Sequence, residues 1–233
     1  MDTYRKSGIV TGIMSITATA AGVASLFMKP IIDAPDFLAR ISANEFKVLA
    51  GALLVFIMGW ADAGIGIAMY PVLRRHNEGV ALGAAGFRIF DGVFVCLGAV
   101  LLLLLATLSR EFAAAGPAAR IQLQSLGTLL HEGRGWVGDV AGLFAWCIGA
   151  FLYYGLFYRT RLVPRWLSAW GLAGLPLTVT AIVLVLFRQL SSASTIHTLL
   201  NLPTAVQEMV LAVWLIVKGF NPSASASPQR KTA

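Results

Sequence analysis

Charged side chains are scarce in this chain of 233 residues. Asp, Glu, Lys and Arg make up 12% of it, whereas they make up about a quarter of a typical soluble protein. Hydrophobic residues make up 58%, and the mean hydropathy is +0.76. This composition excludes a soluble globular protein. Because one membrane-spanning helix uses about 20 apolar residues, the chain can hold roughly six spans with short connections.

Cysteine and histidine are also rare, with two and three copies. Cys96 and Cys147 have no second Cys or His at metal-ligand spacing, so we interpret both as small buried hydrophobic residues. His76, His131 and His197 fall at different depths relative to the apolar segments. An intramembrane zinc enzyme needs about three ligands and an open position at one depth. We therefore expect no metal, no cofactor and no catalytic residues.

Six apolar segments predict an all-α fold, a polytopic bundle of six transmembrane helices. Residues 29–47 and 109–134 are predicted to be connections, the first with one short amphipathic helix and the second with an amphipathic helix at 118–130. We expect residues 1–220 to form a single transmembrane domain and residues 221–233, rich in Ser, Ala and Pro, to be a disordered cytoplasmic tail. The predicted spans cover about 9–28, 48–73, 80–108, 136–158, 166–187 and 202–217.

The first apolar segment has a second interpretation. Ala18-Thr19-Ala20 resembles a signal-peptidase site behind a short basic start. Since the apolar stretch continues past this triplet to Phe27, we favour a retained signal anchor over a cleaved signal peptide.

Basic residues cluster at the ends of the predicted spans. With both termini on one side, that side holds ten Lys and Arg and the other side seven, and the remaining one, Arg88, lies inside a span. This excess favours cytoplasmic termini. We assign the net charge of +7 to this orientation bias, not to a nucleic-acid partner, and attraction to anionic lipid headgroups is a by-product. Aromatic residues at the ends of the fourth span, Trp136, Tyr153, Tyr154 and Tyr158, are predicted to mark the two membrane interfaces.

Four ionisable residues lie inside apolar spans: Asp62 in the second, Arg88 and Asp91 in the third, and Glu208 in the sixth. Each costs about 2.5 to 3.5 kcal/mol near the bilayer centre, so partners in the protein interior are expected. At a rise of about 1.5 Å per residue, all four lie roughly 12 to 16 Å from the cytoplasmic ends of their helices. We therefore predict that they share one layer.

Within this layer, Arg88 and Asp91 are three residues apart and share a helix face, and a guanidinium can pair with two carboxylates. Three acids against one base leave an excess of negative charge. Either one or two carboxylates are protonated, or a cationic ligand completes the set. The alternative is a purely structural ion-pair network that fixes helix register.

Two further features of the fourth span concern its start and its packing. Asp139 either lines an outer vestibule or, as we favour, caps the helix start beside Arg134. Small residues spaced three or four apart predict a close contact with another helix, namely Gly138, Ala141 or Gly142, Ala145 and Gly149.

Several stretches resemble the bacterial multi-pass membrane proteins grouped as domain of unknown function 4386. The similar segments are Asp62 to Leu73, Ala81 to Asp91, Tyr158 to Leu167 and Glu208 to Gly219. The resemblance implies a bacterial membrane protein of this topology and implies no reaction. The family typically has Glu three residues after the Arg of the third span, and here Asp91 stands in that place, with a side chain one methylene shorter.

From these features we expect a multi-pass protein of the bacterial inner membrane, with both termini cytoplasmic. Its expected function is to bind or transport a small cationic or proton-coupled solute at Asp62, Arg88, Asp91 and Glu208. The alternatives are a non-transporting sensor or accessory scaffold subunit and, third, an intramembrane enzyme. The expected partners are the lipid bilayer and this solute, with no nucleic acid, and the sequence leaves the oligomeric state open.

Overall fold

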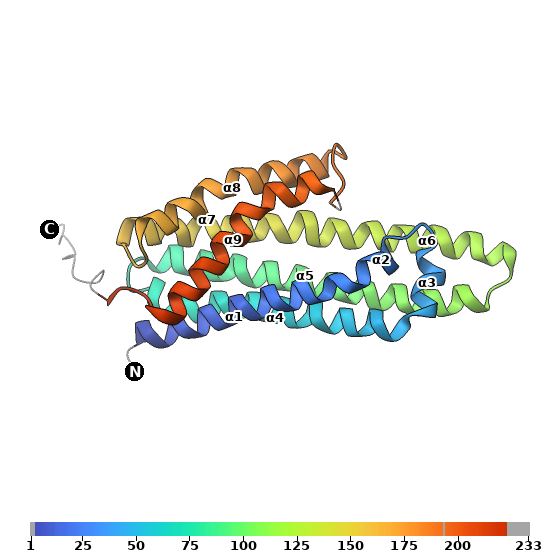
Figure 1. The fold of residues 1–233 in the computed structure, drawn as a ribbon, viewed down its shortest axis with the longest axis horizontal. Coiled ribbons are helices and arrows are strands. Elements are labelled where there is room, and N and C mark those ends of the chain that lie inside the picture. The colour runs from blue at the N-terminus through green and yellow to red at the C-terminus, as the bar shows by residue number, and fades with distance from the viewer. Residues whose placement is uncertain (1–2, 193, 223–233) are drawn as a thin grey trace.

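The computed structural model describes residues 3–192 and 194–222, and the secondary structure of these residues is entirely helical. Long helices joined by short turns run along the length of the molecule (Figure 1). In chain order the helices are α1 (Thr3–Ser25), the 3-10 helix η1 (Leu26–Met28), α2 (Lys29–Ile32), α3 (Phe37–Ala43), α4 (Glu45–Leu73), α5 (Glu78–Ala114), α6 (Pro117–Gly135), the π-helical segment η2 (Trp136–Gly142), α7 (Leu143–Thr160), α8 (Arg165–Leu186) and α9 (Thr195–Val217).

Six helical stretches of the described chain are long and apolar enough to cross a membrane. Each coincides with one of the six predicted spans, so the predicted all-helical fold with six candidate spans is confirmed. The stretches are Thr3–Ile32, Glu45–Leu73, Glu78–Ala114, Pro117–Thr160, Arg165–Leu186 and Thr195–Val217.

The six long helices form a ring in which neighbours in sequence are neighbours in space. Contacts link α1 to α4, α4 to α5, α5 to α7, α7 to α8 and α8 to α9. Helix α9 also packs against α1, which closes the ring, and it crosses obliquely in front of the other helices (Figure 1). Side chains that point inward from any of these helices therefore share one interior.

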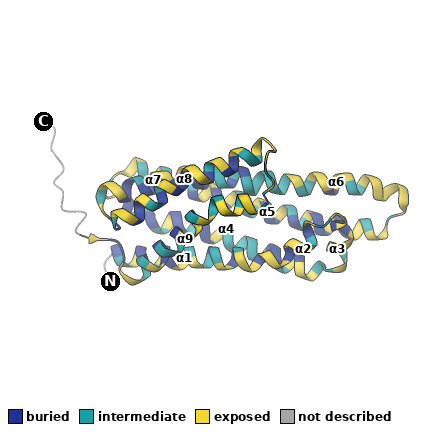
Figure 2. Ribbon diagram, turned by 45° about the horizontal axis from the view of Figure 1, so that its top comes forward, coloured by how far each residue is buried: buried dark blue, intermediate teal, exposed yellow. Residues whose placement is uncertain are grey.

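The outside of the bundle carries large apolar side chains that the protein does not cover, and exposed positions recur along the outer faces of the helices (Figure 2). Examples are Leu53, Trp60, Phe90, Phe151 and Val213. Apolar surface on this scale marks contact with a partner or a membrane. Together with the length of the helices, it supports embedding in a lipid bilayer.

Helix α5 and the stretch Pro117–Thr160 are much longer than a bilayer requires. Helix α5 has 37 residues, which at about 1.5 Å per residue is roughly 55 Å, whereas the hydrocarbon core is about 30 Å thick. The far end of α5 and the helix α6 project beyond α8 and α9 (Figure 1). A separate apolar cluster that includes Leu38, Ile41, Leu102 and Leu105 holds this end together.

The predicted connection at 109–134 is wrong in its extent. Helix α5 continues to Ala114, α6 begins at Pro117, and α6 runs through η2 directly into α7. The amphipathic helix expected at 118–130 is present as part of α6. The polar residues of this segment lie in helices that extend beyond the apolar layer. The prediction took their polarity as the sign of a non-helical connection, which is why its extent was wrong. The connection at 29–47 does contain short helices, α2 and α3.

The chain end is described up to Pro222. Asn221, the first residue of the predicted tail, donates its backbone N–H to the Leu162 carbonyl at 2.8 Å. The chain therefore packs here beside the turn between α7 and α8. The predicted disordered tail covers residues 221–233, of which residues 223–233 lie outside the described part of the chain.

Candidate functional site

The centre of the site is an ion pair between α5 and α4. Arg88 Nη2 donates a hydrogen bond to Asp62 Oδ1 at 2.7 Å. Arg88 is 1% exposed and Asp62 is 7% exposed, so the pair is shielded from both water and lipid. The predicted interior partner of these two charges is therefore confirmed.

Asp91 joins the same guanidinium from one turn further along α5. Its Oδ2 lies 3.3 Å from Arg88 Nη1, which is close enough for charge pairing but poorly aligned for a hydrogen bond. Among the described residues, Arg88 Nε and Nη1 and Asp91 Oδ2 have no hydrogen-bond partner. Buried polar groups nearly always have one, so the hydrogen bonding of this group is incomplete, although Nη1 and Oδ2 face each other in the ion pair.

Glycines on neighbouring helices make space for this layer. A Cβ at Gly66 of α4 would lie 2.9 Å from Arg88 Cβ, and one at Gly149 of α7 would lie 3.5 Å from Arg88 Cγ. At the end of η2, a Cβ at Gly142 would lie 3.7 Å from Asp91 Oδ1. The close contact predicted for the small residues of the fourth span is thus made with α5 by Gly142 and Gly149.

Glu208 of α9 lies beside this group without joining its ion pairs. It is half-buried, and its Oε1 accepts a hydrogen bond from Trp146 Nε1 of α7 at 3.1 Å. It is near enough to interact electrostatically with Arg88 and Asp62. The structure thus connects Asp62, Arg88 and Asp91 directly and places Glu208 near them, bonded to another helix.

Sequence reasoning missed the uncharged polar residues next to the site. Tyr154 donates its hydroxyl to Gln207 Oε1 at 2.5 Å, and Gln207 Nε2 donates to the Leu167 carbonyl at 3.0 Å. Gln207 is fully buried and precedes Glu208 in the chain. A glutamine within an apolar span is the signal that could have found this network, because such a side chain needs partners in the interior.

The interface positions predicted for two tyrosines are wrong. Tyr153 and Tyr154 are 2% and 1% exposed and pack in the core with Phe157. Tyr158 is 41% exposed, and the Arg165 guanidinium lies 5.4 Å from its ring centroid. Position along a span indicates depth, whereas the helix face decides whether a tyrosine meets lipid or the interior.

Comparison with known proteins identifies the family. Residues 10–219 match the family described as Domain of unknown function (DUF4386). The chain belongs to this family. The match confirms the resemblance seen in the sequence and contains all four residues of the charged group. Neither the search of curated proteins nor the search of solved structures found a match.

In this DUF4386 protein, the histidines and acids at the end of the bundle opposite the chain termini make longer side-chain contacts than those of the Arg88 group. His131 Nε2 lies 4.0 Å from Asp33 Oδ1, and the side chain of Asn201 contacts His197. Asp139 lies in η2 and interacts electrostatically with Arg134, the neighbour expected for it. The predicted cap is wrong, because α6 runs through η2 into α7 and no helix starts there. Over residues 3–192 and 194–222, His, Cys, Asp and Glu form no group of three or more that could hold a metal ion.

The two cysteines of the DUF4386 domain are unpaired thiols. Cys147 is buried, as predicted, and Cys96 is half-buried. Cys96 lies on α5 opposite Gly59 of α4, where a Cβ on the glycine would be 2.7 Å from the sulfur. Both cysteines therefore pack as small apolar side chains.

Proposed function

We propose that this DUF4386 protein binds or transports a small cationic or proton-coupled solute at Asp62, Arg88, Asp91 and Glu208. The observation that supports this most is the incomplete pairing of the group. One buried guanidinium faces two buried carboxylates, yet Arg88 Nε and Nη1 and Asp91 Oδ2 have no hydrogen-bond partner among the described residues.

The charge balance indicates which kind of ligand would complete the group. Asp62, Asp91 and Glu208 against Arg88 leave an excess of two carboxylates. Ionisable groups at membrane depth that exceed their partners are typical of ion and proton pathways. A bound proton or a small cation would reduce the excess, and a water oxygen could accept from the unpaired N–H groups of Arg88.

Glu208 is the residue best suited to test this proposal, because neutralising it leaves the Arg88 ion pairs intact. The purified protein is reconstituted into liposomes that contain a pH-sensitive dye, and a potassium diffusion potential drives proton entry. We expect a pH-dependent proton flux that Glu208→Gln abolishes without lowering the unfolding temperature. The control Glu132→Gln changes an exposed acid of α6 and should retain the flux.

A structural role is the second candidate, because the polar bonds also connect helices. The Arg88–Asp62 bond joins α5 to α4, and the Trp146–Glu208 bond joins α7 to α9. A scaffold or accessory subunit would move no protons and would copurify with a stoichiometric partner protein. If Glu208→Gln fails to assemble and the parent protein shows no pH-linked flux, this second function replaces the first.

We also propose that the protein lies in the bacterial inner membrane with both termini in the cytoplasm. The described ends of the chain lie at the same end of the bundle (Figure 1). The turns at Arg74–Asn77 and Arg161–Pro164 carry basic residues at this end. Short loops rich in Lys and Arg favour the cytoplasmic side.

A further inference from the structure

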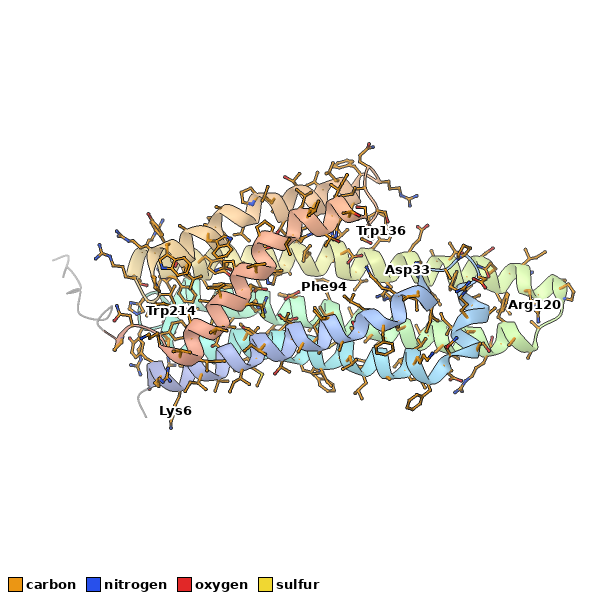
Figure 3. All side chains as sticks on the ribbon, in the orientation of Figure 1. Lys6, Asp33, Phe94, Arg120, Trp136 and Trp214 are labelled. Atoms are coloured by element: carbon orange, nitrogen blue, oxygen red, sulfur yellow. The ribbon has the colours of Figure 1, made fainter. Side chains whose placement is uncertain are left out.

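A cleft of about 550 Å³ opens at the end of the bundle that carries the chain termini. One wall is the turn between α7 and α8, and the other is the end of α9 with the residues that follow it. Trp214, which contributes to the cleft, lies at the same end of the molecule as Lys6 (Figure 3). The lining residues are Arg161, Leu162, Val163, Pro164, Arg165, Trp214, Lys218, Gly219, Phe220, Asn221 and Pro222.

The charges that line this cleft are all positive. Arg161, Arg165 and Lys218 contribute three cations, and the lining contains no acidic residue. None of the three has an ion pair among the described residues. Three cations around one cavity repel one another, so an anion bound between them would be stabilised.

A further cationic group lies next to the same cleft. Arg5 Nη1 of α1 is buried and has no hydrogen-bond partner among the described residues. It is adjacent to Gly219, at which a Cβ would lie 3.5 Å from this nitrogen. Gly219 has a φ of +74°, a backbone conformation in which glycine is favoured, so the chain turns there and brings the cleft to Arg5.

The walls are held together by backbone contacts and have apolar faces. Asn221 donates its backbone N–H to the Leu162 carbonyl at 2.8 Å, and its side chain donates to the Arg161 carbonyl at 3.4 Å. Leu162 and Phe220 are buried, and Trp214 is half-buried. The cleft thus combines an apolar floor with a cationic rim.

We propose that this cleft binds the headgroup phosphate of an anionic phospholipid. The candidate span α8 begins at Arg165 and the candidate span α9 ends at Val217, so the cleft lies where lipid headgroups would be. Basic side chains at this level attract anionic lipids. The phosphate would lie between Arg161, Arg165 and Lys218, and the lipid chains would extend along apolar residues toward the bilayer.

The test measures lipid binding to the full chain purified in a neutral detergent. Dioleoyl phosphatidylglycerol or dioleoyl phosphatidylcholine is titrated in, and bound lipid is counted by native mass spectrometry. We expect the triple variant Arg161→Gln, Arg165→Gln and Lys218→Gln to weaken phosphatidylglycerol binding by about tenfold or more. Phosphatidylcholine binding should stay as it is in the parent protein.

The matched control removes three cations that do not line the cleft, through Lys6→Gln, Arg74→Gln and Arg159→Gln. It should retain phosphatidylglycerol binding within about twofold. If the triple cleft variant does not fold, the double variant Arg161→Gln and Lys218→Gln replaces it, with a weaker loss expected.

Three results would overturn the proposal. The first is an equal loss in the cleft and control variants, which would mean that overall charge and not the cleft attracts the lipid. The second is unchanged binding in the cleft variants. The third is that inorganic phosphate competes with the lipid and stabilises the protein as well as the lipid does, which would identify a soluble anion as the ligand.

Discussion

Arg88 has the smallest exposed fraction of any charged residue in the described part of the chain. Its single aligned hydrogen bond goes to Asp62, although a guanidinium has five N–H donors. A buried charge without its partner is costly, whereas a pair replaced as a whole is often tolerated. The stability of the layer should therefore depend on whether Asp62 and Arg88 are changed singly or together.

Arg88→Gln should destabilise the protein by about 3 to 5 kcal/mol, because it leaves two buried carboxylates without a base. The free energy of unfolding in detergent, measured by denaturant titration, checks this. In the double variant Asp62→Asn and Arg88→Gln, more than half of the loss should be recovered. Equal losses in the single and double variants would show that the ion pair does not hold α4 to α5.

His76 provides a pH-dependent prediction at a residue outside the candidate spans. Burial and the nearby Arg75 lower the pKa of His76 below its ordinary value of 6.5. The unfolded chain therefore binds a proton at a higher pH than the folded chain, and stability falls as the pH drops through about 6.5. His76→Gln should reduce this acid sensitivity in thermal unfolding curves recorded from neutral to acidic pH. If His76→Gln leaves the pH profile unchanged, His76 does not cause the loss of stability at acidic pH.

Asp62, Arg88 and Asp91 could be predicted from the sequence because charges inside apolar spans are rare and need partners. The partners of Trp146 and Gln207 could not be predicted in the same way. Their hydrogen bonds to Glu208 and to Tyr154 depend on which faces of α7 and α9 meet, and the sequence does not specify this. Distance along the chain gives depth, but helix rotation decides the contacts.

At the scale of elements, glycines control how closely α4 and α5 approach. A Cβ at Gly66 would lie 2.9 Å from Arg88 Cβ and 3.0 Å from the Ala85 carbonyl oxygen. A Cβ at Gly86, on α5, would have no neighbouring atom within 4 Å. These two glycines form a matched pair for testing whether helix contact positions the guanidinium.

Gly66→Ala should destabilise the protein by about 1 to 3 kcal/mol, because the added methyl group forces the two helices apart. Gly86→Ala should be neutral or stabilising by up to about 1 kcal/mol, since alanine is the better helix former. Thermal unfolding of both variants in the same detergent compares them. If the two substitutions have the same effect, close packing at Gly66 does not matter for stability.

Sequence reasoning did not predict that α6 continues through η2 into α7 as one helical stretch. Residues 136–142 form a π-helical segment, a local widening that lets a helix continue through an irregular stretch. Its sequence contains Gly138 and Asp139, which on composition alone indicate a helix start. Tertiary packing of this segment against α5 supplies the contacts that the local sequence does not show.

At the scale of the whole molecule, the closed ring of candidate spans brings α9 back to α1. The helix count and the helix order followed from six apolar segments, but ring closure did not. This closure places Glu208 of α9 near Arg88 of α5 and forms one wall of the basic cleft. The function proposed for the charged group depends on it.

The proposed orientation makes a prediction for the intact protein. A fluorescent reporter that folds only in the cytoplasm should be active when fused after Ala233, and an alkaline phosphatase reporter there should be inactive. The reverse pattern should appear for fusions after Ala115, at the opposite end of the bundle. Activity of the phosphatase at Ala233 would place the basic end outside and contradict the orientation.

The most direct test of the charged site is infrared difference spectroscopy of the purified protein between acidic and alkaline pH. We predict a band from the C=O stretch of a protonated carboxylic acid that titrates in the parent protein and disappears in Glu208→Gln or Asp91→Asn. The exposed control Glu132→Gln should retain the band. A parent spectrum without such a band, or one that neither variant changes, would contradict a site that holds a proton.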